Sequence, residues 1–194
     1  MNIRSVINFL RHKFQKRPVI QFLGDNSNLP YDIIISGPEN IIVDENCKIG
    51  SNTIIFATHA KVHIKKYFLG ANGLHIIAGS HERRIGRFCA DISDSEKRLD
   101  IGLDKDITIN EDVWCGMNVS ILRGVNVARG STIATGSVVT KSTPPYSLNG
   151  GVPSHFIKFY WTIDQILEHE SKLYPLDERY TREELEEIFA KYQK

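Results

Sequence analysis

The sequence contains few cysteines, no long apolar run and almost no net charge. Its three cysteines, Cys47, Cys89 and Cys115, show no Cys-x-x-Cys spacing, which argues against a disulfide framework and against a zinc ribbon. No apolar run approaches the roughly 20 residues that are needed to cross a bilayer. The 24 basic and 23 acidic side chains leave a formal net charge of +1, so extensive binding to nucleic acid is not expected.

The chain also lacks the features of a secretory signal. Arg4, Arg11 and Lys13 interrupt the apolar segment that such a signal requires. Together with the unpaired cysteines, this predicts a cytoplasmic protein. A length of 194 residues predicts one domain with short appendages.

The sequence does contain a period of six residues. A first file of mostly aliphatic side chains runs without a break through Ile109, Cys115, Ile121, Val127, Ile133 and Val139. A second file follows four residues after each of the first five members and consists of Val113, Val119, Val125, Ser131 and Ser137. Neither the helical period of 3.6 nor the strand period of 2 explains a six. A triangular solenoid does, because three short strands, each with one inward side chain, complete a coil of about 18 residues.

The same pattern occurs upstream with interruptions. Two shorter files run through Val43, Ile49 and Ile55, and through Ile64, Gly70 and Ile76. Cys47 and Cys115 fall within the files, so they are expected to be small buried side chains.

Both ends of the chain predict helices outside the coil. Apolar residues at helical spacing indicate an amphipathic helix over residues 2–16. Residues 164–172 indicate a second helix, and a capping box at Thr181 and Glu184 opens a third that runs to about residue 192. The expected regions are residues 1–24 (helix and linker), 25–160 (solenoid, with a polar loop at about 79–106) and 161–194 (helical extension).

The two ends carry opposite charge. Residues 1–24 hold five basic and no acidic side chains, whereas residues 164–194 hold nine acidic and five basic ones. We interpret these segments as caps of the coil that attract each other or a neighbouring subunit. A weak contact of the basic helix with an anionic membrane surface is the alternative.

The repeats resemble those of a known enzyme family. Residues 107–141 read ITINEDVWCGMNVSILRGVNVARGSTIATGSVVTK, and GGVP follows at 150–153. These motifs resemble the left-handed β-helix, hexapeptide-repeat acyltransferases, in particular the galactoside, maltose and surface-polysaccharide sugar O-acetyltransferases. The resemblance covers about residues 40–160. It implies an all-β solenoid, acetyl-CoA as co-substrate with no tightly bound cofactor and no metal, a carbohydrate acceptor, and a homotrimer with active sites between subunits.

His81 is the candidate catalytic base. A sugar hydroxyl is a poor nucleophile at neutral pH, so a base must take its proton, and histidine has a suitable pKa. His81 follows the run that ends at Ile76, and the resemblance implies a catalytic histidine at this place. A surface histidine is the alternative. His59 and His63, in an irregular stretch, and His75, within the coil, are expected to be structural or solvated.

The polar loop after His81 is expected to reach across the groove of a neighbouring subunit. Arg83 and Arg84 in this loop are candidates for binding an anionic sugar, and a solvated basic loop is the alternative. The carbonic anhydrases of the same architecture need three zinc histidines in adjacent coils. The next histidine after His81 is His155, which argues against that activity.

The resemblance also implies a donor site for CoA. Trp114 would lie beside the acetyl end, with simple corner packing as the alternative. Small residues that permit close approach of the pantetheine arm are Gly116, Ala134 and Thr135, and an N–H group near Gly116 is a candidate oxyanion donor. Thr140 and Lys141 match a CoA-contacting pair. His155 and Lys158 stand where the related enzymes carry arginines toward the phosphates.

The sequence therefore predicts an acetyl-CoA-dependent O-acetyltransferase that acts on a bacterial surface polysaccharide or its precursor. Two alternatives stay open. The acceptor is instead an amine of an amino sugar or antibiotic, or the chain is a non-catalytic hexapeptide scaffold.

Overall fold

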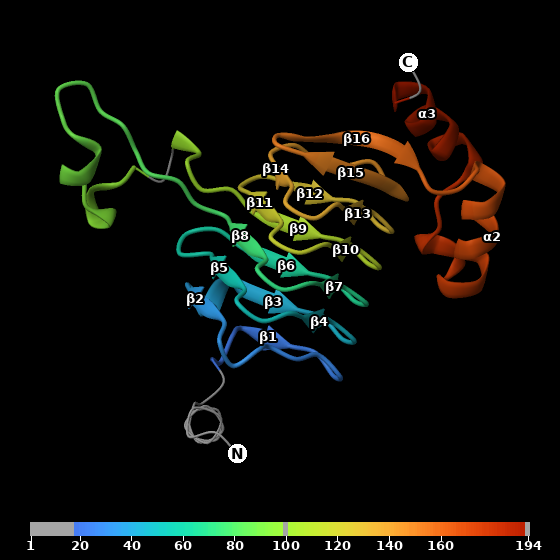
Figure 1. The fold of residues 1–194 in the computed structure, drawn as a ribbon, viewed down its shortest axis with the longest axis horizontal. Helices are drawn as coiled ribbons and strands as arrows, with labels where there is room; N and C mark the ends of the chain where they lie inside the picture. The colour runs from blue at the N-terminus through green and yellow to red at the C-terminus, as the bar shows by residue number, and fades with distance from the viewer. Residues whose placement is uncertain (1–17, 99–100, 193–194) are drawn as a thin grey trace.

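The chain folds into a three-sided coil of short strands. The computed structural model describes residues 18–98 and 101–192, so the helix expected over residues 2–16 lies outside the described residues. Figure 1 shows the strands stacked in successive turns, with a long excursion on one side and two helices on the other. This architecture confirms the predicted left-handed parallel β-helix with one long loop and C-terminal helices.

The strands form three sheets, one on each side of the coil. Sheet A joins β1 (Phe22–Leu23), β3 (Ile41–Val43), β6 (Val62–Ile64), β9 (Ile107–Ile109) and β12 (Asn126–Val127). Sheet B joins β4 (Lys48–Ile49), β7 (Leu69–Gly70), β10 (Trp114–Cys115), β13 (Thr132–Ile133), β15 (Ser147–Gly151) and β16 (Ser154–Phe159). Sheet C joins β2 (Ile34–Ser36), β5 (Ile54–Phe56), β8 (His75–Ile77), β11 (Ser120–Leu122) and β14 (Val138–Val139). All pairs are parallel except the hairpin of β15 and β16, which ends the coil. The first strand begins shortly before the expected boundary at residue 25.

The two files fill the interior of the coil. Every member of the first file (Ile109 to Val139) and of the second file (Val113 to Ser137) is at most 2% exposed. Asn126 lies against Thr108, and Val138 lies against Ser120, so each partner is three units of the six-residue period further along the chain. Cys47 and Cys115 are fully buried, and burial raises the pKa of the Cys115 thiol to about 12. The Cys115 thiol is therefore protonated at neutral pH and is no nucleophile.

A third file with the same period of six residues forms the corners of the coil. The sequence analysis missed it. Its members have φ between +54° and +76° and are Asp112, Asn118, Gly124, Gly130 and Gly136. Asn, Asp and above all Gly enter this left-handed region at lower cost than other residues. The spacing of these residue types is visible in the sequence and would have marked each turn.

The predicted coil length is wrong for the N-terminal coils. Ile34 lies against Ile54 and Ile54 lies against His75, and both steps along the chain are longer than three units of six. The steps from sheet A to B and from B to C keep the period of six, as from Lys48 to Ile54. All the additional residues therefore lie at the edge where sheet C turns into sheet A, which we call the C–A edge.

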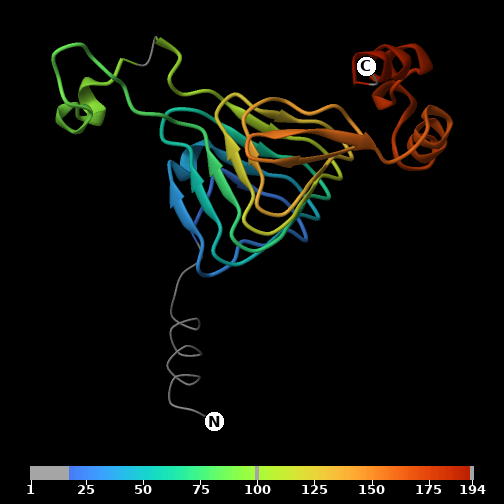
Figure 2. The same cartoon turned by 45° about the horizontal axis from the view of Figure 1, so that its top comes forward.

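The C–A edge is irregular in three successive coils. The first insertion holds the short helix η1 (Pro38–Asn40), and the second covers residues 57–61. The third is the long excursion, which carries η2 (Cys89–Asp91) and η3 (Asp94–Glu96) and projects away from the coil in Figures 1 and 2. The coil closes again at Lys105, whose N–H donates to the Ala78 carbonyl at 3.0 Å. The next coil passes this edge without an insertion.

Two C-terminal helices pack beside the last coils. α2 (Ile163–Leu173) begins after a capping box of Thr162 and Gln165, and α3 (Arg182–Tyr192) follows the short helix η5 (Leu176–Glu178). The predicted box at Thr181 and Glu184 is present, since the Glu184 N–H donates to Thr181 Oγ1 at 3.2 Å. Among the described residues, no helix has the length and apolar character to cross a membrane.

Candidate active site

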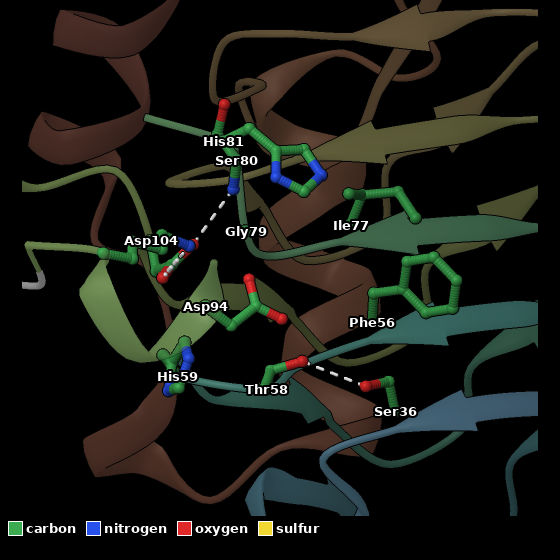
Figure 3. Close-up of a pocket in the computed structure, with 11 residues that line it drawn as sticks. Ser36, Phe56, Thr58, His59, Ile77, Gly79, Ser80, His81, Asp94 and Asp104 are labelled. Carbon is green, nitrogen blue, oxygen red and sulfur yellow. Dashed lines mark hydrogen bonds and ion pairs between the residues drawn. The ribbon is translucent and has the colours of Figure 1, made fainter. Parts of the chain in front are cut away.

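His81 lies beside a pocket of about 300 Å³ at the C–A edge. The pocket is built where the three irregular corners stack on one another (Figure 3). Its lining residues are Ser36, Phe56, Thr58, His59, Ile77, Gly79, Ser80, His81, Asp94, Lys97 and Asp104. The strand ends and the second insertion supply one wall, and the excursion folds back to supply the other.

The backbone beside His81 is held while its ring stays accessible. The Ser80 N–H donates to Asp104 Oδ1 at 2.9 Å, and Asp104 accepts in turn from Lys97 Nζ at 2.5 Å. Among the described residues, none hydrogen-bonds to the His81 ring, which is exposed. The imidazole is therefore placed next to the pocket with its nitrogens available to a substrate.

His59 is a pocket residue that the sequence analysis did not identify. It was expected to be structural or solvated, but it lies in the second insertion and lines the same pocket as His81. The signal for it was the interruption of the period of six at residues 57–61. His63 does not lie in an irregular stretch, because it occupies the middle of β6 with its Nε2 3.0 Å from Asp44 Oδ1.

The structure does not bring Arg83 and Arg84 to the pocket of His81. Both line a separate hollow with Ile85 and Arg98. For Arg84 the reason is the Glu82 carboxylate, which is 1% exposed and accepts from Arg84 Nε at 2.8 Å and Arg98 Nε at 2.6 Å. Hydrogen bonds from Arg84, then from the Arg98 backbone, hold the pKa of Glu82 well below its usual range. Arg84 therefore serves the internal structure of the excursion, and the alternative of a solvated basic loop is wrong for this residue.

Part of the predicted donor site comes together in a second pocket. Thr140, Lys141 and His155 line a hollow of about 520 Å³ with the cis-proline turn at Pro153. Tyr192 of α3 lines it too, which the sequence analysis missed because a helix far downstream supplies it. Lys158 is exposed on β16, opposite Leu148, and is not among the lining residues.

The remaining donor residues lie on another side of the coil. Trp114 stands on β10 in sheet B and is 50% exposed, so its ring lies on an outer strand face and not at a corner. Gly116, Ala134 and Thr135 lie where sheet B turns into sheet C. The Gly116 N–H donates to the Ile133 carbonyl at 2.8 Å and is therefore used between coils, so an oxyanion donor near Gly116 stays a prediction that concerns the neighbouring N–H groups.

Gly116 is required by close packing between coils. A Cβ at this position would lie 2.7 Å from both the N and Oγ1 atoms of Thr135. We expect Gly116→Ala to lower the free energy of unfolding by about 1–3 kcal/mol, as other overpacked interiors do. Urea denaturation measures this, and Met117→Ala on the exposed neighbouring side chain is the control. Equal midpoints for both variants would contradict the expectation.

No group of three or more His, Cys, Asp or Glu side chains within residues 18–98 and 101–192 is arranged to hold a metal ion.

Both pockets have lining residues at the C–A edge. β8, β11 and β14 are successive neighbours in sheet C, so the corner at Thr140 and Lys141 lies two coils beyond the corner at His81. At the usual strand spacing this separation is about 10 Å.

Comparisons with known proteins place the fold. No family model and no curated protein sequence matches the chain. A hexapeptide-repeat acetyltransferase from Vibrio cholerae, solved with acetyl coenzyme A, is similar in structure, with a TM-score of 0.62 and 22% identity over 84% of this chain and 80% of that one. A galactoside acetyltransferase in complex with coenzyme A has a TM-score of 0.61 and 22% identity over 93% of this chain and 81% of that one.

A third similar structure is named as an N-acyltransferase, an enzyme that acylates nitrogen. It is an N-acyltransferase from Bacillus cereus in complex with dTDP and 3-hydroxybutyryl-CoA, with a TM-score of 0.63 and 14% identity over 88% of this chain and 94% of that one. At these identities the likeness concerns the fold. The chain therefore has the left-handed β-helix fold of the hexapeptide-repeat acetyltransferases.

Proposed function

We propose that the protein transfers the acetyl group of acetyl-CoA to a sugar hydroxyl, with His81 as general base. The observation that carries the proposal is the accessible His81 ring beside a pocket, on the same edge of the coil as the hollow of Thr140 and Lys141. CoA lying along this edge would place its phosphates toward Lys141 and its thioester toward His81. The CoA and acetyl-CoA complexes of the similar structures support this donor.

The proposed chemistry is a direct transfer. A ring nitrogen of His81 takes the proton of the acceptor hydroxyl as its oxygen attacks the thioester carbonyl. The tetrahedral intermediate collapses, the carbon–sulfur bond breaks, and the imidazolium returns its proton to the CoA sulfur. The products are the acetylated sugar and free CoA.

We further propose a homotrimer with its active sites between subunits. Trp114 and the Gly116 corner belong to sheet B and its turn into sheet C, whereas His81 lies at the opposite end of the strands of sheet C. One chain cannot bring these groups together around the coil. A neighbouring subunit that presents its sheet B to the C–A edge would complete the site, and the excursion would cover that neighbour.

The test combines binding and turnover. CoA at 100 times its dissociation constant should stabilise the protein by about 2.7 kcal/mol, which a thermal-shift titration detects. Incubation with acetyl-CoA and a panel of sugars should release free thiol. Absence of both effects would leave the non-catalytic scaffold as the function.

N-acetylation is the second candidate, and the similarity to the Bacillus cereus N-acyltransferase favours it. The geometry at His81 serves an amine acceptor equally well, because the base again removes a proton from the attacking atom. Alkali distinguishes the two products, since it cleaves an ester and leaves an amide. For O-acetylation, the acceptor that we propose is a bacterial surface polysaccharide or its precursor.

A further inference from the structure

The pocket beside His81 contains one carboxylate that no described residue neutralises. Asp104 and Lys97 are at most 8% exposed and form an ion pair at 2.5 Å, so their charges cancel. Asp94, at the start of η3, also lines the pocket, and its side chain has no hydrogen bond or ion pair with any described residue. Figure 3 shows the Asp94 carboxylate between the corner of Thr58 and His59 on one side and residues 79–81 on the other.

The arginines of the excursion do not offset this charge. Arg84 and Arg98 bind the Glu82 carboxylate, and Arg87 Nη1 donates to Glu96 Oε1 at 2.9 Å. Arg83 lines the separate hollow with Arg84 and not the pocket of His81. The histidines aside, the pocket therefore carries a net charge of −1, because Asp94 is its one uncompensated acidic or basic side chain among the described residues.

The rest of the pocket suits a sugar ring. Phe56 is 42% exposed and lies next to Ile77, so the two present an apolar surface to the pocket. The hydroxyls of Ser36 and Thr58 lie 2.9 Å apart at its edge. A ring with one apolar face and polar edges fits such a combination of apolar surface and few polar groups.

We infer that this pocket selects an acceptor whose sugar ring carries no negative charge, and that Asp94 is the residue that rejects uronic acids. The inference rests on the proposed function and specifies its substrate class. A carboxylate on the acceptor ring would meet the carboxylate of Asp94, which is exposed and therefore screened in part by water, so we expect the repulsion to be worth about a tenfold change in affinity. The hydroxyls of a neutral sugar instead donate hydrogen bonds to the Asp94 carboxylate, so one residue provides both attraction and rejection.

The experiment compares matched acceptors that differ in one group. Methyl glucoside with methyl glucuronide, and methyl galactoside with methyl galacturonide, are assayed for thiol release from acetyl-CoA. For the wild-type protein, kcat/KM should be at least tenfold higher for the neutral member of a pair. Asp94→Asn should bring the ratio close to one, and Asp94→Lys should invert it, while the KM for acetyl-CoA stays unchanged.

Asp91→Lys is the matched control, because Asp91 is exposed on the same excursion but does not line the pocket. It should leave the ratio at the wild-type value. The inference is overturned if the wild-type protein uses the uronide as well as the neutral sugar, or if Asp91→Lys shifts the ratio as much as Asp94→Lys. An equal loss for both members in Asp94→Asn also overturns it, because Asp94 would then act by positioning a histidine. Failure of every acceptor to release thiol would instead overturn the proposed function, and the inference with it.

Discussion

Replacing His81 with alanine should lower the kcat of acetyl transfer by about 10²–10⁴-fold, the usual contribution of a general base. The hydroxyl would then have to lose its proton to water while it attacks. CoA binding should not change, because Thr140, Lys141 and His155 line a hollow that does not include His81. Steady-state thiol release and a CoA thermal-shift titration on the same samples measure the two quantities separately.

Two other histidines serve as controls for this variant. His75 is exposed on β8, at the start of the strand that leads to His81, and does not line the pocket, so His75→Ala should retain the wild-type rate. His59 does line the pocket, and His59→Ala tests whether a second imidazole shares the proton transfer. Full activity in His81→Ala together with a large loss in His59→Ala would transfer the role of the base to His59.

Replacing Glu170 with alanine should lower the free energy of unfolding by about 3–5 kcal/mol, the range found when one partner of a buried ion pair is removed. Glu170 of α2 is 1% exposed and accepts from Arg129 Nη1 at 3.1 Å, Tyr146 Oη at 2.7 Å and Tyr180 N at 2.6 Å. Burial, and next the hydrogen bond to Glu170, raise the pKa of the Tyr146 phenol.

The three donors of Glu170 belong to different parts of the chain, so its loss affects how the C-terminal helices dock. Arg129 retains Glu111 at 3.2 Å and the face of Tyr174 at 4.0 Å, but one of its two carboxylate partners disappears. Urea denaturation followed by circular dichroism measures the effect.

Glu168→Ala is the matched control for this variant. Glu168 lies on the same helix and, among the described residues, forms its one ion pair with Lys172 on the exposed surface, so its removal should leave the denaturation midpoint unchanged. Equal midpoints for the Glu170 and Glu168 variants would show that the buried network contributes nothing to docking.

The coil itself could be predicted because its signals are local and repeated. A side chain such as Ile121 is buried because of its place in a six-residue unit, and every unit repeats the same rule. The capping box of Thr181 and Glu184 lies within a single helical turn and is equally visible. The corner file of Asp112 to Gly136 is equally local, because Asp, Asn and Gly recur in it every six residues.

The candidate site could be predicted only in part, for the opposite reason. His81 and the pair Thr140 and Lys141 stand next to regular repeats, so their places on the C–A edge follow from the period. His59 and Asp94 lie in insertions, where the period of six stops. The sequence there does not indicate in which direction the chain runs relative to the coil. Their approach to His81 depends on the excursion folding back on the coil.

The sequence by itself determined the solenoid, its interior and the position of His81, because a repeat specifies burial through spacing alone. The tertiary structure decided which charges reach the pocket. Glu82 pairs with Arg84 and with Arg98, which lies further along the excursion. Asp104 neutralises Lys97, so no described residue pairs with Asp94. Electrostatic pairing depends on distance in space, and in an insertion without a period no spacing in the sequence predicts that distance.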